Sequence, residues 1–304
     1  MKVAVLALAA CVRVTAWSKT AGPDRRQFLA VSTAGAAIAA RPALARDDDD
    51  VGARLLARLD GSSAMRCWGV PWSRGADAAA RTVAAPTVFP AWLAGEWSVA
   101  SSKLKDVTFP KGRQFISERT PGARVASLLE LPNVGNEPFG YRQRFVAAPG
   151  GGAVADRAFN AAQTLEAFWP DCRVARADAR SAGSLALEYA GPTRTRENVS
   201  QHVTLTTRFA EAAAVPGGTF VWSEVFAQEA KEQGLRTEYE VVRSATRRDA
   251  DTVDLAMRAA AFMLPTDALY MDAEGDAVGV YDYAFVLERY PPRGLRMGNS
   301  AVQF

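Results

Sequence analysis

The chain has 304 residues, of which 49% are hydrophobic and 23% charged, and its 36 Lys and Arg against 33 Asp and Glu give a net charge of +3. This balance is typical of a globular protein with one large or two small domains, and it excludes disordered and collagen-like classes. Three Cys and one His are too few for a disulfide-stapled scaffold or a zinc cluster, so both are excluded as well.

Residues 1–45 have the pattern of a cleavable export signal. A basic stretch with Asp24 as its only acid precedes an arginine pair, and a small, apolar stretch follows over 30–40. An A-x-A pattern then marks a cleavage site. The apolar stretch is too short for a stable transmembrane helix, and its Ala and Gly content is typical of twin-arginine signals. The candidate targeting residues are Arg25, Arg26, Phe28, Leu29, Ala43 and Ala45.

The arginine pair with the Phe and Leu behind it resembles the twin-arginine motif, and the basic stretch before it resembles a chloroplast transit peptide. Together they predict a bipartite presequence that ends at Ala45 and directs the protein to the chloroplast thylakoid lumen. A bacterial secretion signal and an uncleaved anchor are the alternatives. No later stretch is apolar enough to span a membrane, so we expect no transmembrane anchor after cleavage.

Removal of this segment changes the charge balance. Residues 1–45 hold six of the 36 basic side chains and one of the 33 acidic ones, which leaves 30 and 32 and a net charge of −2. A nucleic-acid-binding protein needs a basic face that replaces counterions on phosphates. We therefore expect no nucleic-acid partner.

Residues 46–88 are predicted to form an N-terminal helix and an irregular arm. The helix is expected over 51–59, where apolar residues have helical spacing. The stretch 60–88 is rich in Gly, Ser, Ala and Pro, with Trp68 and Trp72 as candidate anchors that pin the arm to the body.

Residues 89–304 are predicted to form a β-barrel-like domain. Period-two patterns rich in Val, Thr, Phe, Tyr and Trp indicate strands. The expected strands are 96–102, 141–146, 185–189, 202–209, 219–226, 237–243, 252–258 and 280–290. A helix over 156–168, with Asp156 as its cap, is expected to pack on one end or face. The predicted class is mainly β with one packed helix, an antiparallel calycin- or lipocalin-like barrel of about eight strands.

Four short motifs carry a family resemblance. A P-x-W-x-x-G-x-W pattern at Pro90–Trp97 includes the G-x-W that begins lipocalins and related calycin barrels. The other motifs are Y/F-x-x-R-F at Tyr141–Phe145, R-x-F-N at Arg157–Asn160, and a last strand at Tyr283–Tyr290. With them, most of 51–304 resembles an uncharacterised domain-of-unknown-function family of cyanobacteria and of plastid-targeted algal and plant proteins. The resemblance implies a fold and a compartment and no established activity.

Catalytic and metal-binding patterns are absent from the sequence. The single His202 stands alone on a predicted strand, where a surface or rim position is expected, and no metal-ligand or nucleotide-loop spacing occurs. We expect no cofactor, no metal and no catalytic residues. Acids near aromatic residues, such as Glu224 and Glu240, are expected on the solvent face, with an enzyme that uses them as the third-ranked hypothesis.

Two cysteines, Cys67 and Cys172, remain after cleavage. They are interpreted as two buried thiols, with a disulfide in an oxidising lumen as the alternative.

The inward-facing positions of the predicted strands are aromatic. Such side chains either fill a small barrel or line a cup for one apolar ligand. The candidate ligand-binding residues are Trp97, Tyr141, Phe145, Phe220, Trp222, Tyr239 and Tyr283. The leading hypothesis is a non-catalytic lumenal protein that binds an apolar or amphipathic small molecule; the alternative is an accessory or assembly factor that docks on a photosynthetic complex.

Overall fold

A computed structural model of the chain describes residues 48–67, 85–117, 120, 129–131, 139–169, 171–192 and 198–290. These residues all belong to one unit, 43–304. The predicted targeting segment lies outside the described residues, as does most of the predicted arm with Trp68 and Trp72.

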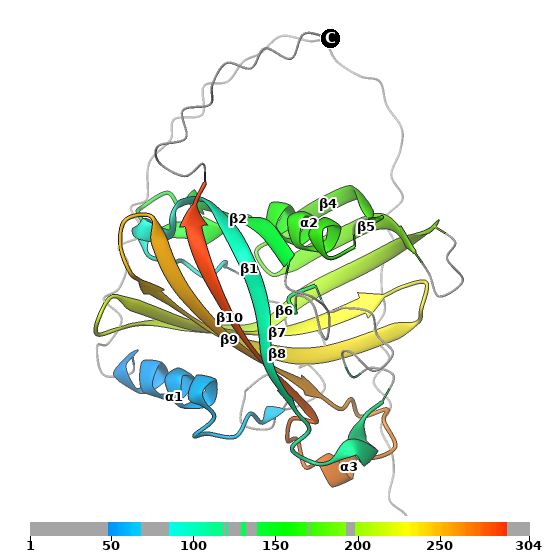
Figure 1. The fold of residues 1–304 in the computed structure, drawn as a ribbon. Helices are drawn as coiled ribbons and strands as arrows, with labels where there is room; N and C mark the ends of the chain where they lie inside the picture. The colour runs from blue at the N-terminus through cyan, green and yellow to red at the C-terminus, as the bar shows by residue number, and fades with distance from the viewer. Residues whose placement is uncertain are drawn as a thin grey trace, which may run out of the picture. The chain divides into compact units, whose positions relative to one another are not determined.

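The described residues form one antiparallel sheet of ten strands in the order β3-β2-β1-β10-β9-β8-β7-β6-β5-β4 (Figure 1). The strands are β1 (Gly95–Thr108), β2 (Phe139–Ala147), β3 (Ala153–Ala155), β4 (Arg173–Ser181), β5 (Ser184–Pro192), β6 (Asn198–Val215), β7 (Thr219–Ala230), β8 (Leu235–Arg247), β9 (Thr252–Phe262) and β10 (Gly279–Arg289). The helical elements are α1 (Asp48–Asp60), α2 (Arg157–Phe168), α3 (Tyr270–Ala273) and the 3₁₀ turns Ala91–Leu93 and Arg113–Phe115. The predicted mainly β, antiparallel class is therefore confirmed.

The sheet has two free ends. The strand order begins at β3 and ends at β4, and within the described residues these two strands are not hydrogen-bonded to each other. Helix α2 contacts β2 near one end and both β4 and β5 at the other, so the curved sheet brings its two ends to one helix (Figure 1). A curved sheet bridged by a helix thus stands where a barrel was predicted.

Both faces of the central strands are covered. The face toward α2, here called the inner face, carries a large cluster that includes Trp97, Phe226 and Tyr239. Helix α1 packs on the outer face against β6, β7, β8 and β9, where Leu55 joins a second cluster. Strand β7 is consequently buried at eight of its twelve positions, in two runs of four, whereas a half-exposed strand shows period-two alternation.

The G-x-W motif has a clear structural role at the start of β1. The Trp97 ring is buried and its indole N–H donates a 2.7 Å hydrogen bond to the Leu93 carbonyl. The Arg289 guanidinium lies 4.1 Å from the Trp97 ring centroid. Gly95 has φ of 130°, and a Cβ there would stand 2.5 Å from Arg289 Nη1, so this position requires glycine.

The two cysteines are free thiols in separate places. Cys67 is buried in the outer cluster and Cys172 in the inner one. Burial raises the pKa of Cys67 to about 12 and that of Cys172 to about 11. The interpretation as two buried thiols fits this arrangement, and the alternative disulfide stays a prediction.

In the part of the chain that the structure describes, none of the helices combines the length and the apolar character needed to cross a membrane.

Candidate functional site

Helix α2 is fastened to both ends of the sheet by its first turn. Asp156 caps the helix by accepting a 3.1 Å hydrogen bond from the Phe159 N–H, as the sequence predicted. The Asn160 amide side chain accepts from the Arg144 N–H at 2.7 Å and donates to the Arg144 carbonyl at 3.2 Å, as a neighbouring strand would. The R-x-F-N motif thereby anchors the helix to β2.

Arg157 connects the first turn of α2 to the other end of the sheet. Its Nη1 donates to the Thr207 hydroxyl on β6 at 2.6 Å and to the Ala182 carbonyl in the β4–β5 turn at 3.2 Å. Its guanidinium also lies 5.3 Å from the Phe226 ring centroid. Because both anchors leave from the first turn, they fix the height of α2 above the inner face.

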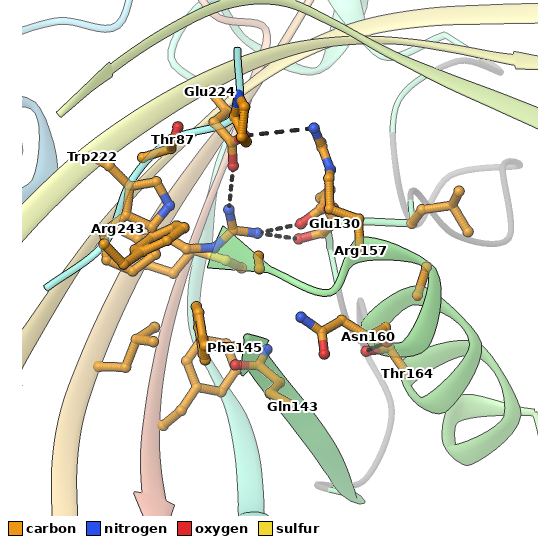
Figure 2. Close-up of a pocket in the computed structure, with 18 of the residues that line it drawn as sticks. Thr87, Glu130, Gln143, Phe145, Arg157, Asn160, Thr164, Trp222, Glu224 and Arg243 are labelled. Carbon is orange, nitrogen blue, oxygen red and sulfur yellow. Dashed lines mark hydrogen bonds and ion pairs between the residues drawn. The ribbon is translucent and has the colours of Figure 1, made fainter. Parts of the chain in front are cut away.

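A cavity of about 100 Å³ lies between α2 and the inner face (Figure 2). That space is large enough for several water-sized groups, since one water needs about 10–15 Å³ on this measure. The cavity is lined by Pro86, Thr87, Phe89, Leu129, Glu130, Tyr141, Gln143, Phe145, Ala155, Arg157, Asn160, Ala161, Thr164, Ala182, Trp222, Glu224, Arg243, Leu255, Met257 and Phe285.

One side of the cavity is aromatic. The Phe89 ring meets Phe145 and Trp222 edge-on, each with 5.2 Å between ring centroids. Edge-to-face packing is a favoured geometry for such rings, and it fixes their orientation. Met257 and Leu255 on β9 continue this apolar wall.

A chain of alternating charges crosses the other side. Arg243 Nη2 donates to Glu130 Oε2 at 2.7 Å, and Arg243 Nη1 lies 3.7 Å from Glu224 Oε2. Arg157 Nη1 lies 3.8 Å from the other oxygen of Glu224. Figure 2 shows the four side chains in the order Glu130, Arg243, Glu224, Arg157. Each has 23% exposure or less, so the four charges balance one another in a largely dry place.

The strand register explains how these charges meet. Trp222 on β7 is directly opposite Arg243 on β8, and Glu224 is two residues further along β7 on the same face. Glu130 comes from outside the sheet, between the buried Leu129 and Leu131. The Leu129 N–H donates to Gln228 Oε1 at 2.9 Å, which ties this segment to β7.

Burial changes the proton affinity of two groups in the cavity. It raises the pKa of Glu224, and the nearby Arg157 and Arg243 offset only part of that effect. It also raises the pKa of the Tyr141 hydroxyl. At neutral pH the tyrosine is therefore a neutral hydrogen-bonding group.

All seven candidate ligand-binding residues lie in the inner cluster, but they do not all reach the cavity. Tyr141, Phe145 and Trp222 line it. Trp97, Phe220, Tyr239 and Tyr283 are buried in the same cluster and do not line it. Whether the three lining residues bind a ligand stays a prediction.

The polar half of the site escaped the sequence analysis. Glu224 was expected on the solvent face, which is wrong: it shares the inner face with Trp222, as the strand alternation itself indicates. Arg157 and Asn160 were visible only as a motif without a role. Glu130 and Arg243 carried no signal, because their pairing joins distant parts of the chain.

His202 lies at the surface, away from this cavity, with 48% of its side chain exposed. Its Nδ1 lies 2.5 Å from Glu232 Oε1, and its backbone N–H donates to Glu232 Oε2 at 2.7 Å. Across the described ranges, no three His, Cys, Asp or Glu side chains are grouped so that they could hold a metal ion.

The fold and the cavity define a class of protein: a curved antiparallel sheet bridged by a helix over an amphipathic pocket. The chain belongs to the DUF6816 family, a domain of unknown function, whose model matches residues 82–291. That range contains every residue that lines the cavity. No curated protein and no solved structure matches the chain.

Proposed function

We propose that this protein binds a small amphipathic molecule in the cavity between α2 and the inner face, without catalysing a reaction. The observation that carries the proposal is the division of the cavity into an aromatic wall and a polar wall. Sites for small molecules are typically concave and largely apolar, with a few placed polar groups that orient the ligand. The aromatic residues around Trp222 would hold the apolar part, and the groups around Arg243 would hold the polar end.

Binding explains the pocket carboxylates better than proton transfer does. Both Glu130 and Glu224 are ion-paired with Arg243, and Glu224 is flanked by Arg157 as well. A general base must come within hydrogen-bond reach of the proton that it removes, and here arginine side chains lie beside both carboxylates. The paired charges instead form a polar wall that can receive the polar end of a ligand.

The test is binding of N-phenyl-1-naphthylamine, a neutral apolar dye that becomes fluorescent in apolar sites. We expect saturable binding to the full chain that is weakened about tenfold or more by Ala161→Leu, because the added carbons fill the cavity from α2. Ala182→Leu fills the cavity from the β4–β5 turn and should weaken dye binding to a similar extent. Ala162→Leu, on the same helix but outside the cavity lining, is the matched control and should bind as the parent does.

Absence of saturable dye binding would contradict the proposal, as would equal binding by all three leucine variants. Thermal unfolding of each variant shows that the fold is intact. Docking on a photosynthetic complex would then become the leading function. Mass spectrometry of the protein purified from its native compartment would identify the bound molecule.

The proposed location is the chloroplast thylakoid lumen, and it rests on the residue pattern of 1–45. Import of the radiolabelled chain into isolated chloroplasts is the test. We expect a product shortened to begin after Ala45 that fractionates with the lumen. Arg25→Lys with Arg26→Lys should leave the product in the stroma, since the twin-arginine pathway requires the pair. A product that keeps residues 25–45 would contradict this location.

A further inference from the structure

We propose that the ligand of this cavity carries a carboxylate, which binds Arg243 in the position that the Glu130 side chain occupies. The inference rests on the proposed function and specifies its ligand. Glu130 is then an intramolecular competitor: its carboxylate is ion-paired with Arg243 until a ligand carboxylate takes its place.

Arg243 is placed to receive a carboxylate. Its position opposite Trp222 sets the guanidinium at the border between the aromatic wall and the polar wall. Only 13% of its side chain is exposed, so it requires a partner of opposite charge. The guanidinium fork matches the geometry of a carboxylate, and such pairs are among the strongest polar contacts in proteins.

Glu130 holds that position without being part of the sheet. Its side chain is 23% exposed, and the neighbouring Leu129 and Leu131 are buried in the inner cluster. The bond from the Leu129 N–H to Gln228 involves only the backbone of this segment. Arg243 Nη2 also donates to the Glu130 backbone carbonyl at 3.4 Å. Rotation about the side-chain bonds of Glu130 moves its carboxylate toward water, which breaks the 2.7 Å ion pair and leaves this longer backbone contact in place.

The charge balance of the cavity selects an anion. Arg157 and Arg243 are balanced by Glu130 and Glu224 (Figure 2). When a ligand carboxylate replaces that of Glu130, the number of charges facing the two arginines is unchanged. An ammonium group would add a third positive charge beside them, which Coulomb repulsion in a partly buried site disfavours. A neutral head group gives Arg243 no replacement for its ion pair.

The aromatic wall sets the rest of the ligand. A carboxylate on Arg243 leaves its attached carbon chain next to Trp222, Phe145 and Met257, all of which line the cavity. Each buried methylene contributes about 0.8 kcal/mol through the hydrophobic effect. The predicted ligand class is a small monocarboxylate with an apolar chain or ring.

Displacement of N-phenyl-1-naphthylamine by octanoate and by octan-1-ol tests the proposal, because the two probes share a chain and differ in head group. In the parent protein octanoate should displace the dye at lower concentration than octanol. Glu130→Gln should raise the affinity for octanoate about tenfold, because it removes the state in which the Glu130 carboxylate is paired with Arg243. The same substitution should leave the affinity for octan-1-ol unchanged.

Two variants complete the test. Glu96→Gln is the matched control. Glu96 forms a 2.9 Å ion pair with Arg142, its side chain is about as exposed as that of Glu130, and it lies outside the cavity lining. Loss of its charge should change the affinity for neither octanoate nor octanol. Arg243→Gln should reduce the affinity for octanoate to that for octanol. Arg243→Lys should keep part of the preference for octanoate over octanol, because it keeps the positive charge.

The outcomes separate this inference from the proposed function. Dye binding with equal displacement by acid and alcohol, in the parent and in Glu130→Gln, overturns the carboxylate inference and leaves the amphipathic site in place. No dye binding overturns the proposed function. Weaker octanoate binding by Glu130→Gln, with dye affinity unchanged, shows that Glu130 assists the ligand and also overturns the inference.

Discussion

Arg58 on α1 donates a 2.8 Å hydrogen bond to Glu240 on β8, whose side chain is only 2% exposed. The Ser223 hydroxyl donates to the same carboxylate oxygen at 2.6 Å. Glu240 faces the outer side of the sheet, so its charge lies under the helix. This contact makes α1 an integral part of the domain.

Arg58→Ala should destabilise the protein by about 3 kcal/mol, because it leaves a buried carboxylate without its countercharge. Arg54→Ala is the matched control on the same helix: Arg54 is 38% exposed and pairs with Glu211 at 2.6 Å, so its loss should cost less than about 1 kcal/mol. Urea unfolding measures both values. Equal losses for the two variants would contradict the interpretation. Adding Glu240→Gln to Arg58→Ala should recover part of the stability.

The sequence predicted the central fold well, because its signal is local. All eight expected strands and both expected helices are present, and Asp156 caps α2 as expected. Strands β3 and β4 were missed, and both lie at the ends of the sheet. Strand β3 has three residues, and β4 has the sequence RVARADARS, in which none of the described side chains is buried. An edge strand needs few apolar residues, so alternation does not reveal it.

The site was only half predictable for a related reason. Aromatic alternation reveals residues such as Trp222 that face the core, because burial follows the strand period. The polar wall depends on pairs such as Arg157 with Glu224, which join a helix to a distant strand. No spacing rule specifies such a pair, and a single acid in a strand is by default expected in solvent. Glu130 lies in a segment without periodicity, so its place beside Arg243 follows only from the fold.

The two thiols should be unreactive in the folded protein. Burial raises the pKa of Cys67 to about 12 and of Cys172 to about 11, so little thiolate is present at pH 8. With Cys11→Ser to remove the cysteine of the targeting segment, we expect negligible reaction with Ellman's reagent until urea unfolds the chain, and then release of two equivalents. Rapid reaction of either thiol in the folded protein, or a mobility shift on a non-reducing gel, would count against this.

Loss of the α2 cap should weaken both the fold and the site. Asp156→Ala removes the acceptor for the Phe159 N–H and should cost about 1 kcal/mol. It also removes the ion pair to Arg144, 3.1 Å away. Asp156→Asn keeps a cap and loses only the charge, so it should retain most of the stability. If the alanine and asparagine variants were equally destabilised, the ion pair and not the cap would be the dominant contribution.

The buried Glu224 should give the protein a measurable pH dependence. Burial raises its pKa above the ordinary value of 4.5, so between that value and the pKa of the folded state the folded protein holds a proton that the unfolded chain has released. The stability associated with this proton is present below that ordinary value and is lost as pH rises through the higher pKa of the folded state.

Glu224→Gln removes this loss, so the variant should gain stability relative to the parent as pH increases from about 4.5. Urea unfolding at a series of pH values measures the difference, which includes no contribution from the raised pKa of Glu240 because both proteins share it. Glu288→Gln, at an exposed carboxylate on β10, provides the baseline for loss of one negative charge. A difference that shrinks with rising pH would mean that Arg157 and Arg243 stabilise the Glu224 carboxylate by more than burial destabilises it.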